Sequence, residues 1–231
     1  MNDVVLLHGA LGAARQLHPL ADALRPNFRV HQLDFEGHAT APPRDRPFRT
    51  QHFAENVVEL LDRNEIGSAA FFGYSMGGYV ALHLAGEHPG LVERVATLGT
   101  KFRWDPPTAA REAARLDPTV IRARVPRFAD ALAERHAGAG GWENVLARTA
   151  DLLRSLGDDP LHTDATIPRV RQPVRIMVGE RDNTVSVDES ADVARRFPDG
   201  SLIVLPDTPH PIEQVDITLL ASALRDFLRP I

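Results

Sequence analysis

The chain lacks cysteine altogether, and Lys101 is the one lysine among 26 basic residues. Without cysteine there can be no disulfide, no thiolate nucleophile and no cysteine-ligated metal. No histidine or carboxylate cluster with metal-ligand spacing lies on one predicted helix face, so we expect no metal and no cofactor. No apolar run approaches the roughly 18 residues of a membrane span. The apolar run at residues 4–7 is too short for a secretory signal. These absences predict a cytoplasmic protein without a membrane partner.

The chain also lacks a basic run, and its net charge is −5. Nucleic acid is therefore not an expected partner. A hydrophobic content of 43% and a charged content of 25% are typical of a soluble globular protein. The length of 231 residues suits one domain, with or without an inserted lobe. We expect a monomer or homodimer.

Short apolar runs alternate with helical patterns along most of the chain. Strands are predicted at residues 4–7, 28–33, 68–72, 91–98, 174–178 and 202–205. Helices are predicted near residues 13–25, 50–64, 78–85, 187–197 and 212–228. Strands joined by helices of this length indicate a parallel sheet with right-handed crossovers.

This alternation breaks off between residues 100 and 166. That stretch has no convincing strand and predicts three helices, near 107–116, 119–136 and 142–156. We therefore predict an α/β core formed by residues 1–99 and 167–231, with residues 100–166 inserted as a helical cap.

The pentapeptide Gly73-Tyr74-Ser75-Met76-Gly77 lies between a predicted strand and a predicted helix. G-x-S-x-G in that context is typical of a nucleophile elbow, in which a serine hydroxyl is exposed on a strained, sharp turn. The two glycines allow strand and helix to approach closely, because a Cβ would clash there. The alternative is a glycine-rich turn that holds an ordinary serine.

Serine needs a base to take its proton and a third group to orient that base. In this arrangement the expected chain order is Ser, then Asp or Glu, then His, each following a strand. His210 follows the last predicted strand and is our candidate base. Asp182 is the preferred acid, because Glu180 lies too close to its strand end and Asp207 is nearly adjacent to His210. A solvated surface role is the alternative for each residue.

A developing oxyanion needs backbone donors. Met76 N–H, at the start of the predicted elbow helix, should be one of them. The other should come from the loop after the first strand, where Gly9 permits close approach. We favour Ala10 N–H over Leu11 N–H. The loop lacks G-x-G-x-x-G, so a nucleotide-binding role is disfavoured.

Taken together, these motifs resemble the α/β-hydrolase superfamily, in its small cytoplasmic serine-hydrolase branch. The matching motifs are His8-Gly9, Asp34-x-x-Gly37-His38, Gly73-x-Ser75-x-Gly77-Gly78, Gly179-x-x-Asp182 and His210. The resemblance implies a three-layer α/β fold of about six mostly parallel strands, without the usual leading antiparallel strands. It also implies attack by Ser75 to form an acyl-enzyme.

Two positions depart from the usual pattern of this superfamily. Ala39 stands where glycine is frequent, and Pro209 stands where a small residue is usual. A serine nucleophile also argues against the branches that attack with a carboxylate.

Substrate pockets in this architecture lie between the cap and the sheet. The aromatic candidates for the pocket lining are Tyr74, Phe102, Trp104, Phe128 and Trp142. For each of them the alternative is a place in the core of the cap. Lys101 and Arg103 follow a strand end and could meet an anionic substrate group, or they could be solvated surface charges.

The function we favour is a serine hydrolase acting on a small carboxylic ester or a related acyl compound. A C–C hydrolase or a lyase or synthase of the menaquinone-pathway type, using the same three residues, is the second hypothesis. A ligand receptor that keeps the fold without catalysis is the third.

Overall fold

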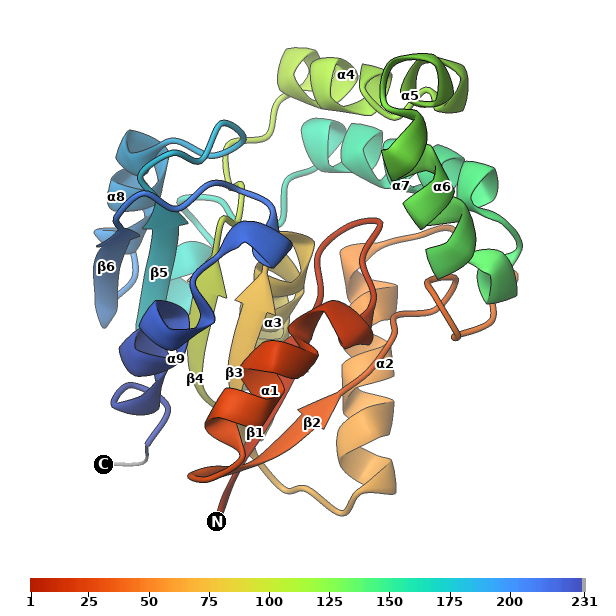
Figure 1. Ribbon diagram of the computed structural model, residues 1–231. Coiled ribbons are helices and arrows are strands. Elements are labelled where there is room, and N and C mark those ends of the chain that lie inside the picture. The colour runs from red at the N-terminus through yellow and green to blue at the C-terminus, as the bar shows by residue number, and fades with distance from the viewer. Residues whose placement is uncertain (230–231) are drawn as a thin grey trace.

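A six-stranded parallel sheet forms the centre of the computed structural model, which describes residues 1–229 (Figure 1). The strands lie in the order β2-β1-β3-β4-β5-β6, and every neighbouring pair is parallel. Their bounds are β1 Asn2–Leu7, β2 Phe28–Gln32, β3 Ala69–Tyr74, β4 Val92–Leu98, β5 Val174–Gly179 and β6 Gly200–Leu205. The predicted fold class is confirmed.

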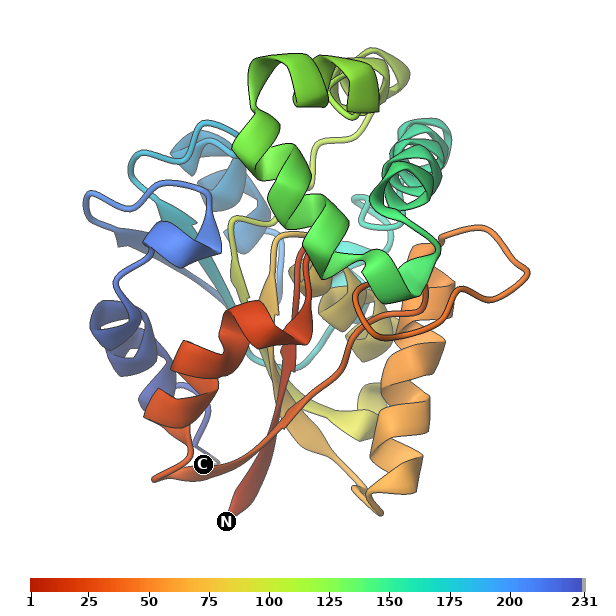
Figure 2. The same ribbon diagram turned by 45° about the vertical axis from the view of Figure 1, so that its right-hand side comes forward.

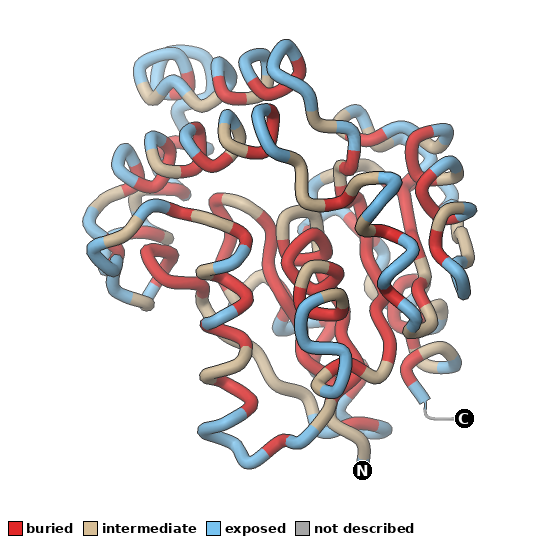
Figure 3. Tube along the Cα trace, turned by 180° about the vertical axis from the view of Figure 1, so that it is seen from behind, coloured by how far each residue is buried: buried red, intermediate tan, exposed pale blue. Residues whose placement is uncertain are grey.

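Helices cover both faces of the sheet, and the alternation of side chains along the strands supplies two apolar cores. Val4 and Leu6 face a cluster that includes α1 (His18–Leu24) and α9 (Ile217–Arg225). Val5 and Leu7 face the opposite cluster, formed with α2 (Thr50–Arg63), α3 (Met76–Glu87) and α8 (Val187–Ala194). The four inner strands β1, β3, β4 and β5 are mostly buried, whereas the edge strands β2 and β6 are largely half-buried or exposed (Figure 3).

Four helices between β4 and β5 lie over the carboxyl ends of the strands (Figure 1). They are α4 (Pro106–Ala114), α5 (Pro118–Arg124), α6 (Pro126–Arg135) and α7 (Trp142–Asp158). The prediction of one helix over residues 119–136 was wrong, because Val125 has φ −138° and ψ 63° and separates α5 from α6. Its neighbour Pro126 explains the break, since proline disfavours helical dihedrals in the residue before it.

Several predicted helix ends also shift. The helix predicted from residue 13 begins as a 3₁₀ turn at Ala14–Leu17, and α8 ends at Ala194. The last predicted helix is divided into a 3₁₀ turn at Ile212–Gln214 and α9. Asp216 caps α9, because its carboxylate accepts the N–H groups of Thr218 and Leu219.

Further 3₁₀ turns lie at Pro89–Leu91, Ala137–Ala139 and Ile167–Arg169. Across residues 1–229, no helix is both long enough and apolar enough to cross a bilayer.

Candidate active site

Ser75 occupies the sharp turn between β3 and α3. Its φ of 51° and ψ of −116° place a non-glycine residue in a strained region of backbone space. The end of β4 fixes this turn, because Ser75 N–H donates to Leu98 O at 2.8 Å and Thr100 Oγ1 donates to Ser75 O at 2.8 Å. The hydroxyl group therefore projects from a rigid corner at the carboxyl edge of the sheet.

The glycines of the elbow sit where backbones nearly touch. A Cβ on Gly73 would lie 2.2 Å from Gly78 N, and a Cβ on Gly77 would lie 2.3 Å from Leu7 O. Both distances are too short for any relaxed structure, so the G-x-S-x-G spacing is dictated by the packing of β1, β3 and α3.

We expect Gly77→Ala to lower the free energy of unfolding by about 3 kcal/mol or more, because the clash is with backbone that cannot move away. Gly86→Ala is the matched control in the same helix, where the new Cβ meets only Val170 Cγ2 at 3.8 Å. That control should be neutral or stabilising by up to about 1 kcal/mol. Urea unfolding of the two variants checks the difference, and equal stabilities would contradict it.

His210 and Asp182 meet at the ends of β6 and β5. His210 Nδ1 lies 2.7 Å from Asp182 Oδ2, and the Asp182 side chain is only 2% exposed. Asp182 Oδ1 accepts the N–H groups of Thr184 at 2.8 Å and Val185 at 2.9 Å. The carboxylate is thus held from one side by the backbone, while its other oxygen is directed at the imidazole.

The other two candidate acids have partners other than His210. Glu180 Oε2 accepts the N–H of Asp207 at 3.0 Å, and the carboxylate of Asp207 pairs with Arg181 at 2.6 Å. The Asp207 side chain is 77% exposed. Of the three carboxylates considered from the sequence, Asp182 is the one that the structure brings to His210.

Two residues around His210 were not singled out for this role from the sequence. A Cβ on Gly99, which has φ 63°, would lie 3.0 Å from Asp182 Oδ2 and 3.1 Å from His210 Nδ1. Glycine is therefore required beneath this pair. Tyr74 O–H donates to His210 O at 3.0 Å and so fixes the backbone of the histidine loop. Gly99 directly follows β4, and a glycine at that position in the sequence was the available indication of close packing near the site.

The loop after β1 turns tightly beside Ser75. Gly12 N–H donates to Gly9 O at 3.1 Å, and a Cβ on Gly9 would lie 3.2 Å from Ser75 Cβ. Within residues 1–229, the N–H groups of Ala10 and Leu11 have no acceptor on the protein. Met76 is the first residue of α3, so its N–H has no partner within the helix. Ala10, Leu11 and Met76 all border the same cavity as Ser75.

His8 precedes this loop but is not placed to act as a base. Its Nδ1 donates to Gly9 O at 2.8 Å, and its Nε2 accepts the N–H of Phe35 at 3.1 Å. Both partners fit only the neutral ring. Burial lowers the pKa of His8 to about 4, so the ring stays neutral at physiological pH.

His8 and His162 together predict how stability depends on pH. Burial lowers the pKa of each to about 4 from the ordinary 6.5. Between those values the unfolded chain binds protons that the folded chain does not, so the free energy of unfolding falls as the pH falls. This contribution is complete above pH 6.5 and is lost progressively toward pH 4, at up to about 1.4 kcal/mol per pH unit for each residue.

Urea unfolding between about pH 8 and pH 5 measures this slope. His162→Gln is the informative variant, because glutamine keeps a donor for Tyr79 O, which His162 Nε2 contacts at 2.9 Å. The variant should show a shallower slope than the wild type. An unchanged slope would contradict the assignment to His162.

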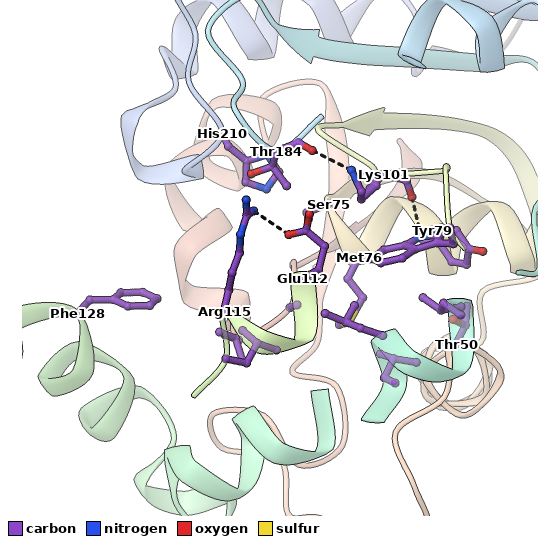
Figure 4. Close-up of a pocket in the computed structure, with 17 residues that line it drawn as sticks. Thr50, Ser75, Met76, Tyr79, Lys101, Glu112, Arg115, Phe128, Thr184 and His210 are labelled. Carbon is purple, nitrogen blue, oxygen red and sulfur yellow. Dashed lines mark hydrogen bonds and ion pairs between the residues drawn. The ribbon is translucent and has the colours of Figure 1, made fainter. Parts of the chain in front are cut away.

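A cavity of about 360 Å³ lies between the sheet edge and helices α4–α7 (Figure 4). Ser75 and His210 line it together with Ala10, Leu11 and Met76. The predicted residues Lys101, Trp104 and Phe128 also line it. The lining residues that the sequence did not suggest are Thr50, Tyr79, Glu112, Arg115, Leu116, Leu152, Leu153, Leu156 and Thr184. Most of this surface is apolar, and its charged groups include Lys101 and the Glu112–Arg115 ion pair (Figure 4).

Three predicted lining residues lie elsewhere, so their place in the lining is corrected. Tyr74 donates its hydroxyl hydrogen bond to the backbone of the loop that carries His210. Phe102 is buried beside Tyr79 and His162. Trp142 is buried at the start of α7, with Arg122 stacked over its ring. Phe102 and Trp142 belong to one apolar core, and the Tyr74 ring packs against the other.

The two predicted cations are already paired. Lys101 borders the cavity, but its ammonium donates to Thr184 O at 3.1 Å and lies 3.8 Å from Glu189. It therefore supports the loop that carries Asp182. Arg103 lies outside the cavity lining and pairs with Asp192 at the surface, at 3.7 Å.

Comparison with known proteins identifies the family of this chain. A model of the family described as alpha/beta hydrolase fold matches residues 3–161, and the chain belongs to that family. The chain is 26% identical over 254 residues to the sn-1-specific diacylglycerol lipase ABHD11 of Danio rerio, covering 98% of this chain and 78% of that protein. It is 27% identical over 226 residues to the pimeloyl-[acyl-carrier protein] methyl ester esterase of Chromobacterium violaceum, covering 90% and 87%.

The solved structure of a thermophilic esterase from Thermogutta terrifontis matches with a TM-score of 0.80 at 22% identity, covering 99% of this chain and 90% of that one. At this identity the structural match speaks for the fold. The family match and the curated relatives support a hydrolase.

Proposed function

We propose that the protein is a serine hydrolase that cleaves small carboxylic esters or related acyl compounds through an acyl-enzyme. One observation carries the proposal. Ser75, on its strained turn, borders the same cavity as His210. His210 Nδ1 is hydrogen-bonded to the buried carboxylate of Asp182. Nucleophile, base and orienting acid are thus available from three separate strand ends.

In the proposed reaction, Ser75 Oγ attacks the carbonyl carbon of the ester while His210 Nε2 takes the hydroxyl proton. Asp182 keeps the other proton on His210 Nδ1 and stabilises the imidazolium. The N–H groups of Met76 and Ala10, or of Leu11 in place of Ala10, receive the oxyanion. His210 returns the proton to the leaving alcohol. A water molecule, deprotonated by the same histidine, then releases the carboxylic acid.

The cavity favours a substrate with an apolar acyl or alcohol group. Its volume of about 360 Å³ is near the lower end of the range for small-molecule sites, roughly 300–1,000 Å³. Leu116, Phe128 and Leu152 contribute apolar walls from α4–α7 and the turn after α4. We therefore propose that the inserted segment, residues 100–166, acts as a cap that selects the substrate.

A C–C hydrolase or lyase could use Lys101 or an arginine to hold a substrate carboxylate. Arg115 borders the cavity but pairs with Glu112 at 2.8 Å, and Arg103 lies outside the lining. Lys101 is a poor candidate for this role, because Thr184 O and Glu189 already occupy its ammonium. Hydrolysis of an ester is therefore the preferred hypothesis over the lyase reaction.

Labelling by a fluorophosphonate probe tests the proposal directly. Wild type should be labelled, and Ser75→Ala and His210→Ala should not. A panel of p-nitrophenyl esters of increasing acyl length would then locate the preferred substrate. An unlabelled wild type that turns over a dicarboxylate would overturn the ester reading in favour of the lyase, and ligand binding without any turnover would favour the receptor.

A further inference from the structure

Two non-glycine residues with left-handed backbone meet at one buried imidazole. Leu11, in the loop after β1, has φ 57°, and Ala39, in the loop after β2, has φ 48°. His136, which follows α6, is fully buried between them. Its Nε2 donates to Leu11 O at 3.0 Å, and its Nδ1 accepts the N–H of Ala39 at 3.0 Å. Figure 2 shows the end of α6 above these loops.

The two contacts define the state of the ring. Nδ1 must be unprotonated to accept the Ala39 N–H, and Nε2 must carry the proton to donate to a carbonyl oxygen. Burial lowers the pKa of His136, which keeps this neutral form. An apolar side chain of similar size could fill the space, but it could make neither bond.

Arg135 makes a second contact with the same carbonyl. Its Nη1 donates to Leu11 O at 2.8 Å, and its Nη2 lies 3.5 Å from Glu213, shortly after His210. The Arg135 side chain is 13% exposed. Leu11 O therefore accepts two hydrogen bonds, one from Arg135, the last residue of α6, and one from His136, the residue after it.

Leu11 is the third residue of the tight turn closed by Gly12 N–H and Gly9 O. In such a turn, a third residue with positive φ normally is glycine, and leucine pays about 1–2 kcal/mol for it. The competing turn has negative φ at this position and differs by rotation of the peptide between the second and third residues. That rotation turns the Leu11 N–H to the other side of the loop and tilts its neighbour Ala10.

We propose that His136 and Arg135 are positioning residues for the oxyanion hole, holding the turn at Leu11 in the strained form that directs backbone N–H groups toward Ser75. The inference rests on the proposed hydrolase function. Neither side chain borders the catalytic cavity, so both act through the loop. Both contacts are made to the Leu11 carbonyl, on the peptide that follows the rotating one, so they act by fixing the position of the loop around a residue whose conformation leucine alone disfavours.

The test compares His136→Leu and His136→Gln with wild type. His136→Leu removes both bonds and should lower kcat by about 10- to 100-fold with little change in KM, because a misplacement of about 1 Å costs about that much. Affinity for a trifluoromethyl ketone, which forms an oxyanion adduct with an active serine, should fall by a similar factor. His136→Gln offers both an acceptor oxygen and an N–H donor, and should recover part of the loss.

A double variant separates strain from packing. Glycine adopts positive φ without cost, so His136→Leu should reduce kcat less in a Leu11→Gly background than in wild type. Should His136→Leu fail to fold, Arg135→Met carries the test, with Arg127→Met as its control. Arg127 is exposed on the same helix.

A fall in melting temperature with unchanged kcat and unchanged ketone affinity would overturn the inference and leave His136 a packing residue. Equal effects of His136→Leu in both Leu11 backgrounds would also count against it. Failure of wild type to react with the fluorophosphonate probe is a different result, because it would overturn the hydrolase function and this inference together.

Discussion

Replacing Ser75 with alanine is expected to lower kcat by on the order of 10⁶, with the folded structure retained. Alanine removes only the hydroxyl oxygen, and the turn is held through the backbone N–H and C=O of Ser75, which bond to Leu98 O and to the Thr100 hydroxyl. His210→Ala should have a similar effect, since an unassisted serine hydroxyl is a weak nucleophile. The variant that lacks both should be no worse than either single variant, because the two groups act in one step.

Steady-state hydrolysis of a p-nitrophenyl ester measures these losses, and circular dichroism checks the fold. Ser68→Ala is the matched serine control. The Ser68 hydroxyl donates to Glu93 at 2.8 Å, before β3 begins and at the opposite end of that strand from Ser75. The control should keep wild-type kcat. Ser75→Ala that still turns over substrate at a rate near that of the control would mean that another group is the nucleophile.

The sequence was sufficient to predict the sheet and the residues that meet at its edge. Parallel strands have their carboxyl ends on the same edge, and functional groups on the loops that follow them gather there. Ser75, Asp182 and His210 each follow a strand, so their order along the chain implied their proximity. The structure brings Asp182 Oδ2 and His210 Nδ1 to 2.7 Å, although the two residues are 28 positions apart.

The inserted helices were predicted less well, because apolar periodicity reports that a helix has a buried face but not what that face packs against. For Trp142 and Phe102 the sequence left open whether they line the cavity or pack in a core, and both pack in a core. The break at Val125 was missed because the apolar spacing continues through Pro126. Pro126 is the residue in the sequence that indicates the break.

The role that we propose for His136 could not be predicted from the sequence. Its partners are 97 and 125 positions away, in loops whose left-handed residues are alanine and leucine. Ala39 departs from the glycine that is usual at its position, but nothing in the sequence indicates which residue compensates for the departure. The compensating group becomes visible only once α6 is placed over the sheet edge.

Asp182→Asn is expected to lower kcat by about 10⁴ while leaving the loop intact. The carboxylate oxygen Oδ1 accepts two N–H groups, from Thr184 and Val185. The one oxygen of asparagine should stay there, because turning it away would leave two donors unpaired beside a buried side chain. The amide nitrogen then faces His210 Nδ1 and donates to it. Nδ1 can accept only when the proton sits on Nε2, and that tautomer cannot take the proton of Ser75.

The two neighbouring carboxylates provide the control variants. Glu180→Gln and Asp207→Asn change the neighbouring carboxylates, whose contacts are with each other's loop and with Arg181, so both should keep near wild-type kcat. The ester assay that measures Ser75→Ala serves here, with melting temperature as the check on folding. A normal rate in Asp182→Asn, or a comparable loss in Asp207→Asn, would show that the imidazole is oriented by something other than Asp182. A loss confined to Asp182→Asn would instead tie the rate to the proton on Nδ1, since that variant alone reverses the direction of the hydrogen bond to His210.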